Sequence, residues 1–209
     1  MEQTFMKEKK ILPLVLSMSL PMMLSMLVNS LYNIVDSYFV AQISEQAMTA
    51  LSLVYPLQLL ETAIAVGFGI GINAAAAFYL GAGERKNAND VVTSGTLLSI
   101  VHGIVLTLFS IGFARYFVGM FTDQQPILED AVKYAWIVFA FTIPNVVAIT
   151  FEKIFQAEGR MKVSMISMLC GCVVNIILDP MLIFGIGFFP KMGIEGAALA
   201  TGIGQVIPL

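Results

Sequence analysis

Residues 173–185 read Val-Val-Asn-Ile-Ile-Leu-Asp-Pro-Met-Leu-Ile-Phe-Gly, which places an amide, an acid and a proline (Asn175, Asp179 and Pro180) inside an apolar run. A carboxylate in an apolar segment of this kind is costly and is retained mainly where it serves a function. A proline there frees a backbone carbonyl and can kink a helix. The stretch therefore predicts a polar site within a hydrophobic helix, and Pro180 either shapes that helix or exposes a carbonyl near the site.

The apolar character extends over the whole chain of 209 residues, of which 58% are hydrophobic and 12% charged. Soluble domains carry about 25% charged residues. About 20 apolar residues span a bilayer as a helix, and residues 91–114 contain no Asp, Glu, Lys or Arg. These properties predict an all-α, polytopic membrane helix bundle in contact with the lipid bilayer. Short loops leave no extramembrane domain for an enzyme site, and we expect no nucleic-acid partner.

Six transmembrane spans are predicted, the last of them cut short: approximately residues 11–40, 47–80, 91–118, 131–155, 163–189 and 193–209. Basic residues near span ends indicate orientation, because they favour the cytoplasmic side. Eight of the eleven basic residues fall on the side of the N-terminus: Lys7, Lys9, Lys10, Arg85, Lys86, Lys153, Arg160 and Lys162. We therefore expect a cytoplasmic N-terminus, with the first, third and fifth spans running outward.

Two of the outward-running spans carry a narrow polar stripe. The first span presents Ser25, Asn29, Asn33 and Asp36. These four lie within an arc of about 80°. The fifth span presents Ser164, Ser167, Gly171, Asn175 and Asp179, which lie within an arc of about 120°. Each stripe puts an amide and an acid on one helix face, and both acids fall in the outer half of the bundle, where they could border one cavity.

The chemistry of such a pair suits a small cation. A low-dielectric environment favours the protonated carboxyl, whereas an approaching cation favours the ionised form. The site can therefore exchange a proton for Na⁺ or a cationic substrate, and amide and hydroxyl oxygens supply further hard ligands. These ligand types do not choose between Na⁺ and H⁺ as the coupling ion, and no other cofactor is expected. The alternative is purely structural, each Asp bonding a polar group of a neighbouring helix.

Three other intramembrane features leave alternatives open. Glu61, near the middle of the second span, could complete the acidic network, line a pathway or pair with a nearby polar group. His102 could relay protons or pack as a neutral side chain. Gly67 and Gly71 are four residues apart, so we expect their common face to let another helix approach closely.

Four segments together resemble the multidrug and toxic compound extrusion (MATE) family. Residues 175–185 resemble its fifth-helix signature, and residues 33–40, Asn-Ile-Val-Asp-Ser-Tyr-Phe-Val, resemble its first helix with the acid. Residues 80–83, Leu-Gly-Ala-Gly, resemble the link between helices two and three. Residues 193–201 resemble the start of helix six. The resemblance covers essentially the whole chain.

This resemblance implies two six-helix lobes around a central cavity, with drug efflux across the bacterial plasma membrane driven by Na⁺ or H⁺ entry. It implies an N-terminal coupling site formed by Asp36, Asn175, Asp179 and Thr201, with Asn33, Glu61 and Pro180 in supporting or pathway roles. Loading that site would bend the first helix and change drug affinity. The expected partners are small amphipathic, often cationic drugs and a C-terminal lobe that this chain lacks.

Other readings remain open at this point. A lipid-linked precursor flippase would line its cavity with several cations for pyrophosphate, and no Lys or Arg is expected deep in any span. An intramembrane aspartyl protease would need Tyr-Asp and Gly-x-Gly-Asp, whereas the acids here read Val-Asp36-Ser and Leu-Asp179-Pro. A half-size subunit acting as a dimer is a third alternative. We expect a transporter and not an enzyme.

Overall fold

The computed structural model describes residues 10–208, and within that range every regular element is an α-helix. Residues 1–9 and 209, and with them Lys7 and Lys9 of the expected basic cluster, lie outside the described residues. The helices follow in the order α2 (Ile11–Ala41), α3 (Glu45–Ala82), α4 (Arg85–Gly119), α5 (Gln125–Ala140), α6 (Thr142–Ala157), α7 (Met161–Phe184) and α8 (Ile194–Val206). The prediction of an all-α membrane bundle is confirmed.

Four of these helices, α2, α3, α4 and α7, are long and apolar enough to cross a bilayer. Local signals set the limits of α3. Ser44 caps its start by accepting a hydrogen bond from the Ala47 N–H at 3.0 Å. Gly83 ends it with φ 81°, in the left-handed region that glycine adopts without strain.

The segment expected as one continuous span over residues 131–155 is instead two helices, α5 and α6, bent by 49°. The break lies at Phe141, three residues before Pro144. Proline has no N–H for the carbonyl four residues earlier, and its ring clashes with that carbonyl. Pro144 therefore accounts for the break beside Ala140, and α5 and α6 together make a fifth, broken span.

The fifth predicted span also ends earlier than expected, at Phe184 and not at residue 189. Gly185 stops α7 with φ 75°, and a Cβ at this position would lie 2.8 Å from the backbone nitrogen of Lys191. The last helix, α8, has 13 residues. At about 1.5 Å per residue it rises about 20 Å, short of a full span.

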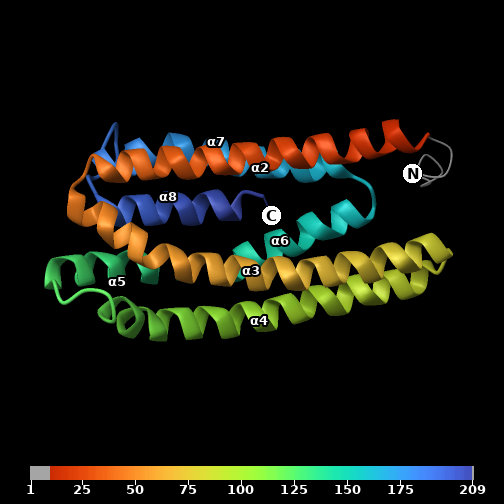
Figure 1. The fold of residues 1–209 in the computed structure, drawn as a ribbon, viewed down its shortest axis with the longest axis horizontal. Helices are drawn as coiled ribbons and strands as arrows, with labels where there is room; N and C mark the ends of the chain where they lie inside the picture. The colour runs from red at the N-terminus through yellow and green to blue at the C-terminus, as the bar shows by residue number, and fades with distance from the viewer. Residues whose placement is uncertain (1–9, 209) are drawn as a thin grey trace.

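The helices form two layers, α2 with α7 and α8, and α3 with α4, α5 and α6 (Figure 1). The α3–α4 and α6–α7 links lie at the same end of the bundle as the described start of α2, and the α2–α3, α4–α5 and α7–α8 links lie at the opposite end. The apolar core gathers at that opposite end, around the end of α2, the start of α3, and α5, with Val40, Val54, Val118, Tyr134, Phe139 and Ile183 fully or nearly fully buried. Away from this core α2 and α3 diverge (Figure 1), and the space between the layers holds the candidate site.

Candidate functional site

A cavity of about 840 Å³ lies between the two layers. Its wall draws on α2, α3, α5, α6, α7 and α8, so it is a property of the whole bundle. Asp36, Asn175 and Thr201 line the part next to the apolar core, whereas Glu152 and Lys153 line the part near the α6–α7 link.

The structure brings together the four residues expected to form a coupling site. Asp179 is fully buried and Asn175 is 2% exposed, and the Asn175 amide donates to Asp179 Oδ1 at 3.5 Å. Asp36, on α2, is near enough to Asp179 to act on it electrostatically. Thr201 lies beside Tyr134, which also lies close to Asp36. Three helices and the α5 tyrosine thus converge at the core end of the cavity.

Each of the four residues presents a buried oxygen that has no hydrogen-bond partner among the described residues: Asp36 Oδ1, Asn175 Oδ1, Asp179 Oδ2 and Thr201 Oγ1. A buried polar atom without a partner costs about 1–3 kcal/mol, so such atoms call for an explanation. Two carboxylates, an amide and a hydroxyl offer only oxygen ligands. That set suits a hard cation such as Na⁺, or a proton shared between the acids.

Two glycines position this cluster by allowing α7 and α8 to approach closely. A Cβ at Gly171 would lie 2.5 Å from the carbonyl oxygen of Gly204, and a Cβ at Gly204 would lie 2.9 Å from the Asn175 Cβ. Both positions therefore have room only for hydrogen. This contact sets α8, the helix that carries Thr201, close against the face of α7 that carries Asn175.

The expected supporting residues divide into two groups. Asn33 lines the cavity but is exposed, and its amide donates to the Asn29 carbonyl at 2.7 Å, so it is not joined to the acids by a hydrogen bond. Pro180 is half-buried within a continuous α7. Because it has no N–H, the carbonyl of Ile176 lacks its helical donor.

Glu61 and His102 lie outside the cavity wall. Glu61 is 5% exposed and sits beside Thr142 and Asn145, at the break between α5 and α6. The His102 ring hydrogen-bonds the Leu98 carbonyl at 2.9 Å and stacks on Phe68 at a centroid distance of 4.3 Å. Of the alternatives considered for them, these positions match pairing with nearby polar groups for Glu61 and packing for His102.

The expected role of Gly67 and Gly71 is wrong within the described residues, because a Cβ at either would meet nothing within 4 Å. The glycine at a close contact is Gly69, which is buried and faces α6. A Cβ there would lie 2.8 Å from the Lys153 Cγ. The spacing of the pair indicated only a common face, and the tertiary contact uses the opposite face of α3, which carries Gly69.

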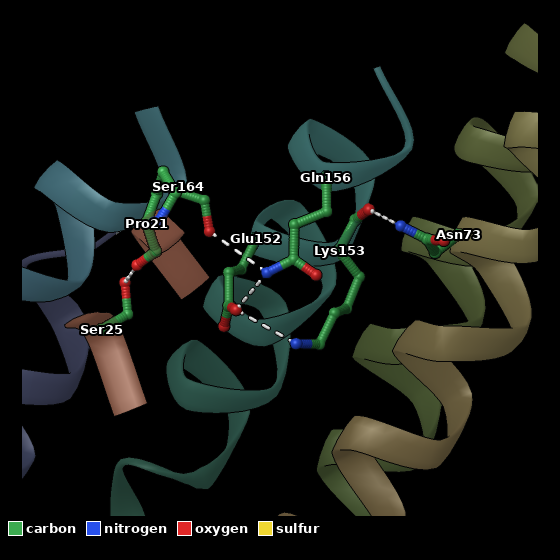
Figure 2. Close-up of polar contacts among 7 residues, drawn as sticks. All are labelled: Pro21, Ser25, Asn73, Glu152, Lys153, Gln156 and Ser164. Atoms are coloured by element: carbon green, nitrogen blue, oxygen red, sulfur yellow. Dashed lines mark hydrogen bonds and ion pairs between the residues drawn. The ribbon is translucent and has the colours of Figure 1, made fainter. Parts of the chain in front are cut away.

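Lys153 lies four residues from the end of α6, among the basic residues expected near a span end. It belongs to a polar network on the cavity wall (Figure 2). Glu152 Oε1 accepts from Lys153 Nζ at 3.0 Å and from Gln156 Nε2 at 2.6 Å. Gln156 also donates to the Ser164 hydroxyl at 3.4 Å, which links α6 to α7. The four-residue spacing of Glu152 and Gln156 was the available signal for one polar helix face.

A bundle of membrane-crossing helices around a deep cavity, with a buried oxygen cluster at one end, defines a polytopic membrane transporter. The family model described as MatE matches residues 21–181. The chain belongs to this family, the multidrug and toxic compound extrusion (MATE) transporters, whose members are transport proteins and not enzymes.

Individual relatives agree with this placement. The chain is 30% identical to the multidrug export protein MepA of Staphylococcus haemolyticus, over 99% of this chain and 45% of that protein. It is 28% identical to the FAD transporter of Shewanella oneidensis, over 93% of this chain and 43% of that protein. A solved MOP-superfamily transporter from Pyrococcus furiosus superposes with a TM-score of 0.87 at 29% identity, over 93% of this chain and 42% of that one. The chain thus spans about half the length of these relatives.

Proposed function

We propose that this chain is the N-terminal lobe of a cation-coupled multidrug exporter of a bacterial plasma membrane. The observation that supports this most is the cluster of four buried oxygens without a partner among the described residues, on Asp36, Asn175, Asp179 and Thr201; three of these residues line one end of the large cavity and Asp179 lies behind them. A cation bound there would supply a partner for these oxygens, and a proton would supply one for the two acids. The cavity beside it has the size of typical small-molecule sites.

Coupling follows from the helices that carry these groups. Asp36 is on α2 and Asp179 on α7, so a cation between them ties the two helices together. Loss of the cation leaves two acids facing each other, a repulsion that protonation or movement of α2 relieves. A substrate that binds one arrangement better than the other then shifts the equilibrium between them, which is the basis of alternating access.

The substrates are small amphipathic drugs, cationic ones included. The cavity wall combines apolar and aromatic side chains such as Met26, Tyr55 and Phe155 with polar ones such as Asn29 and Gln58. Apolar walls with a few placed polar groups are typical of small-molecule sites, and methionine adapts to ligands of different shape. A flippase would need several cations, and the described wall offers Lys153 alone, already paired with Glu152.

The remaining half of the transporter is a second lobe, on the same polypeptide or on another copy. The α2 helix supports this, because its apolar surface is widely exposed, with Leu12, Leu16, Met23 and Leu27 each more than half exposed. Lipid covers part of such a surface and a second lobe the rest. The described basic residues Lys10, Arg85, Lys86, Arg160 and Lys162 flank the helix ends at one end of the bundle, which supports a cytoplasmic location for that end.

Dye efflux from everted membrane vesicles that contain the complete transporter tests this proposal. Energised vesicles with the wild-type transporter should transport ethidium. Vesicles with the Asp36→Asn or the Asp179→Asn variant should contain normal amounts of the protein but transport ethidium only at the rate of vesicles that lack the transporter. Asp90→Asn is the matched control, since Asp90 is exposed near the start of α4. Unchanged efflux in both buried-acid variants would refute the coupling site.

A further inference from the structure

The second polar region of the cavity lies at the end opposite the acidic cluster. Glu152 and Lys153 are five and four residues from the end of α6, whereas Asp36 and Asp179 are each five residues from the other end of α2 and α7. Both side chains of the Glu152–Lys153 pair are largely buried, with 21% and 14% of their surface exposed. The cavity therefore has an acidic end and an end that holds a cation.

The position of Lys153 is fixed by α3. Its stem packs where a side chain at Gly69 would be, and its backbone carbonyl accepts a hydrogen bond from Asn73 at 2.6 Å (Figure 2). Gly69 and Asn73 are four residues apart, so they form one face of α3. The contacts with Gly69 and Asn73 thus hold Lys153 at the cavity wall, away from bulk solvent.

The hydrogen bonds leave the ammonium with spare donors. An ammonium has three N–H groups, and Lys153 gives one hydrogen bond, to Glu152, among the described residues. The same Glu152 oxygen already accepts from Gln156. Lys153 is also the one Lys or Arg on the described cavity wall. An anionic group that enters the cavity would therefore find charge-assisted donors here and an acid at the other end.

We infer that Lys153 is a specificity-determining residue that binds the carboxylate or phosphate of an amphipathic substrate. Glu152 neutralises the ammonium when no substrate is bound and holds it in place. Gln156, which bridges Glu152 and Ser164, keeps the acid aligned. This inference rests on the proposed function, because it assigns a substrate class to the same cavity, zwitterions as well as simple cations.

The test compares two dyes of nearly equal shape on the purified transporter. Rhodamine B has a free carboxylate, and its ethyl ester has none, so the ratio of their dissociation constants by fluorescence anisotropy reports recognition of the carboxylate. The wild type should favour rhodamine B. In Lys153→Gln the preference should fall at least about tenfold, while the ester binds as before. Lys153→Arg should retain the preference, and Glu152→Gln, which frees the ammonium, should increase it.

Matched glycine variants test the seating of Lys153. Gly69→Ala should weaken rhodamine B more than the ester, whereas Gly67→Ala, where nothing lies within 4 Å, should leave both unchanged. An unchanged ratio in Lys153→Gln, or an equal loss for both dyes, overturns the inference. If Lys153→Gln fails to fold, an unchanged ratio in Glu152→Gln has the same consequence. Efflux that persists in the Asp36→Asn and Asp179→Asn variants would contradict the proposed function alone, since dye preference does not depend on ion coupling. Wild-type protein that binds neither dye would contradict both the proposed function and this inference.

Discussion

Asn175 and Asp179 lie one turn apart on α7, and the amide nitrogen donates to Asp179 Oδ1 at 3.5 Å, while Asn175 Oδ1 and Asp179 Oδ2 have no partner among the described residues. The contact is at the long end for a hydrogen bond. It orients the two side chains without using up their acceptors. This arrangement suits the cation site that we propose.

The first prediction concerns this pair. Asn175→Leu removes the one described donor to Asp179, so a buried carboxylate loses a partner. We expect the free energy of unfolding to fall by about 1–3 kcal/mol, seen as a lower midpoint of thermal unfolding in detergent. Val173→Leu, at an exposed position on the same helix, should leave the midpoint nearly unchanged. A similar midpoint for both variants would show that the amide does not support the acid.

The second prediction concerns the contact between α7 and α8. Gly204→Ala places a methyl group 2.9 Å from the Asn175 Cβ, so α8 must move away and take Thr201 with it. Overpacking of this kind costs about 1–3 kcal/mol. Thermal unfolding should register that loss, and the cation concentration for half-maximal efflux should rise. Gly67→Ala is the control; equal behaviour of the two variants would refute the close approach.

The third prediction separates Glu61 from the coupling site. Glu61 lies beside Thr142 and Asn145 and is not on the cavity wall. Glu61→Gln keeps its size and its capacity for hydrogen bonds, so stability should change by less than about 1 kcal/mol. Ion-driven efflux should persist, in contrast to Asp179→Asn. Complete loss of ion dependence in Glu61→Gln, with normal protein levels, would place Glu61 in the coupling network.

The fourth prediction addresses Pro180. Its missing N–H leaves the Ile176 carbonyl free, one turn back on the helix that carries Asp179. Pro180→Ala restores the helical hydrogen bond and removes that carbonyl from use. We expect a folded protein that needs more cation for half-maximal efflux, with a smaller defect than Asp179→Asn. An unchanged cation requirement would limit Pro180 to shaping the helix.

The long spans were predictable because apolar length and local signals determine them. The first span was expected at residues 11–40 and is Ile11–Ala41. The polar stripes likewise marked Asp36 and Asp179, because helical periodicity places polar residues on one face before any tertiary contact is known. Both acids are buried, and each has an oxygen with no partner in the part of the chain that the structure describes.

What escaped prediction depends on contacts between helices. Lys153 was counted among the basic residues at a span end, and only its packing against Gly69 turns it toward the cavity. Tyr134 belongs to no polar stripe in the sequence. In the structure the break before Pro144 sets α5 at an angle to α6, and Tyr134 of α5 lies near Asp36 and Thr201. Contacts of this kind depend on how the helices pack against one another, and the periodicity of polar residues along one helix does not predict that packing.

The most direct test of the coupling site follows the ion and not the drug. The complete transporter is reconstituted in liposomes, a drug gradient is imposed, and Na⁺ and H⁺ movement are recorded separately with a tracer and a pH dye. We expect drug flow in one direction to drive one of these cations in the other direction, and we expect Asp179→Asn to abolish the cation flux. Drug transport with no opposing cation flux in the wild type, or the same flux in Asp179→Asn, would contradict it.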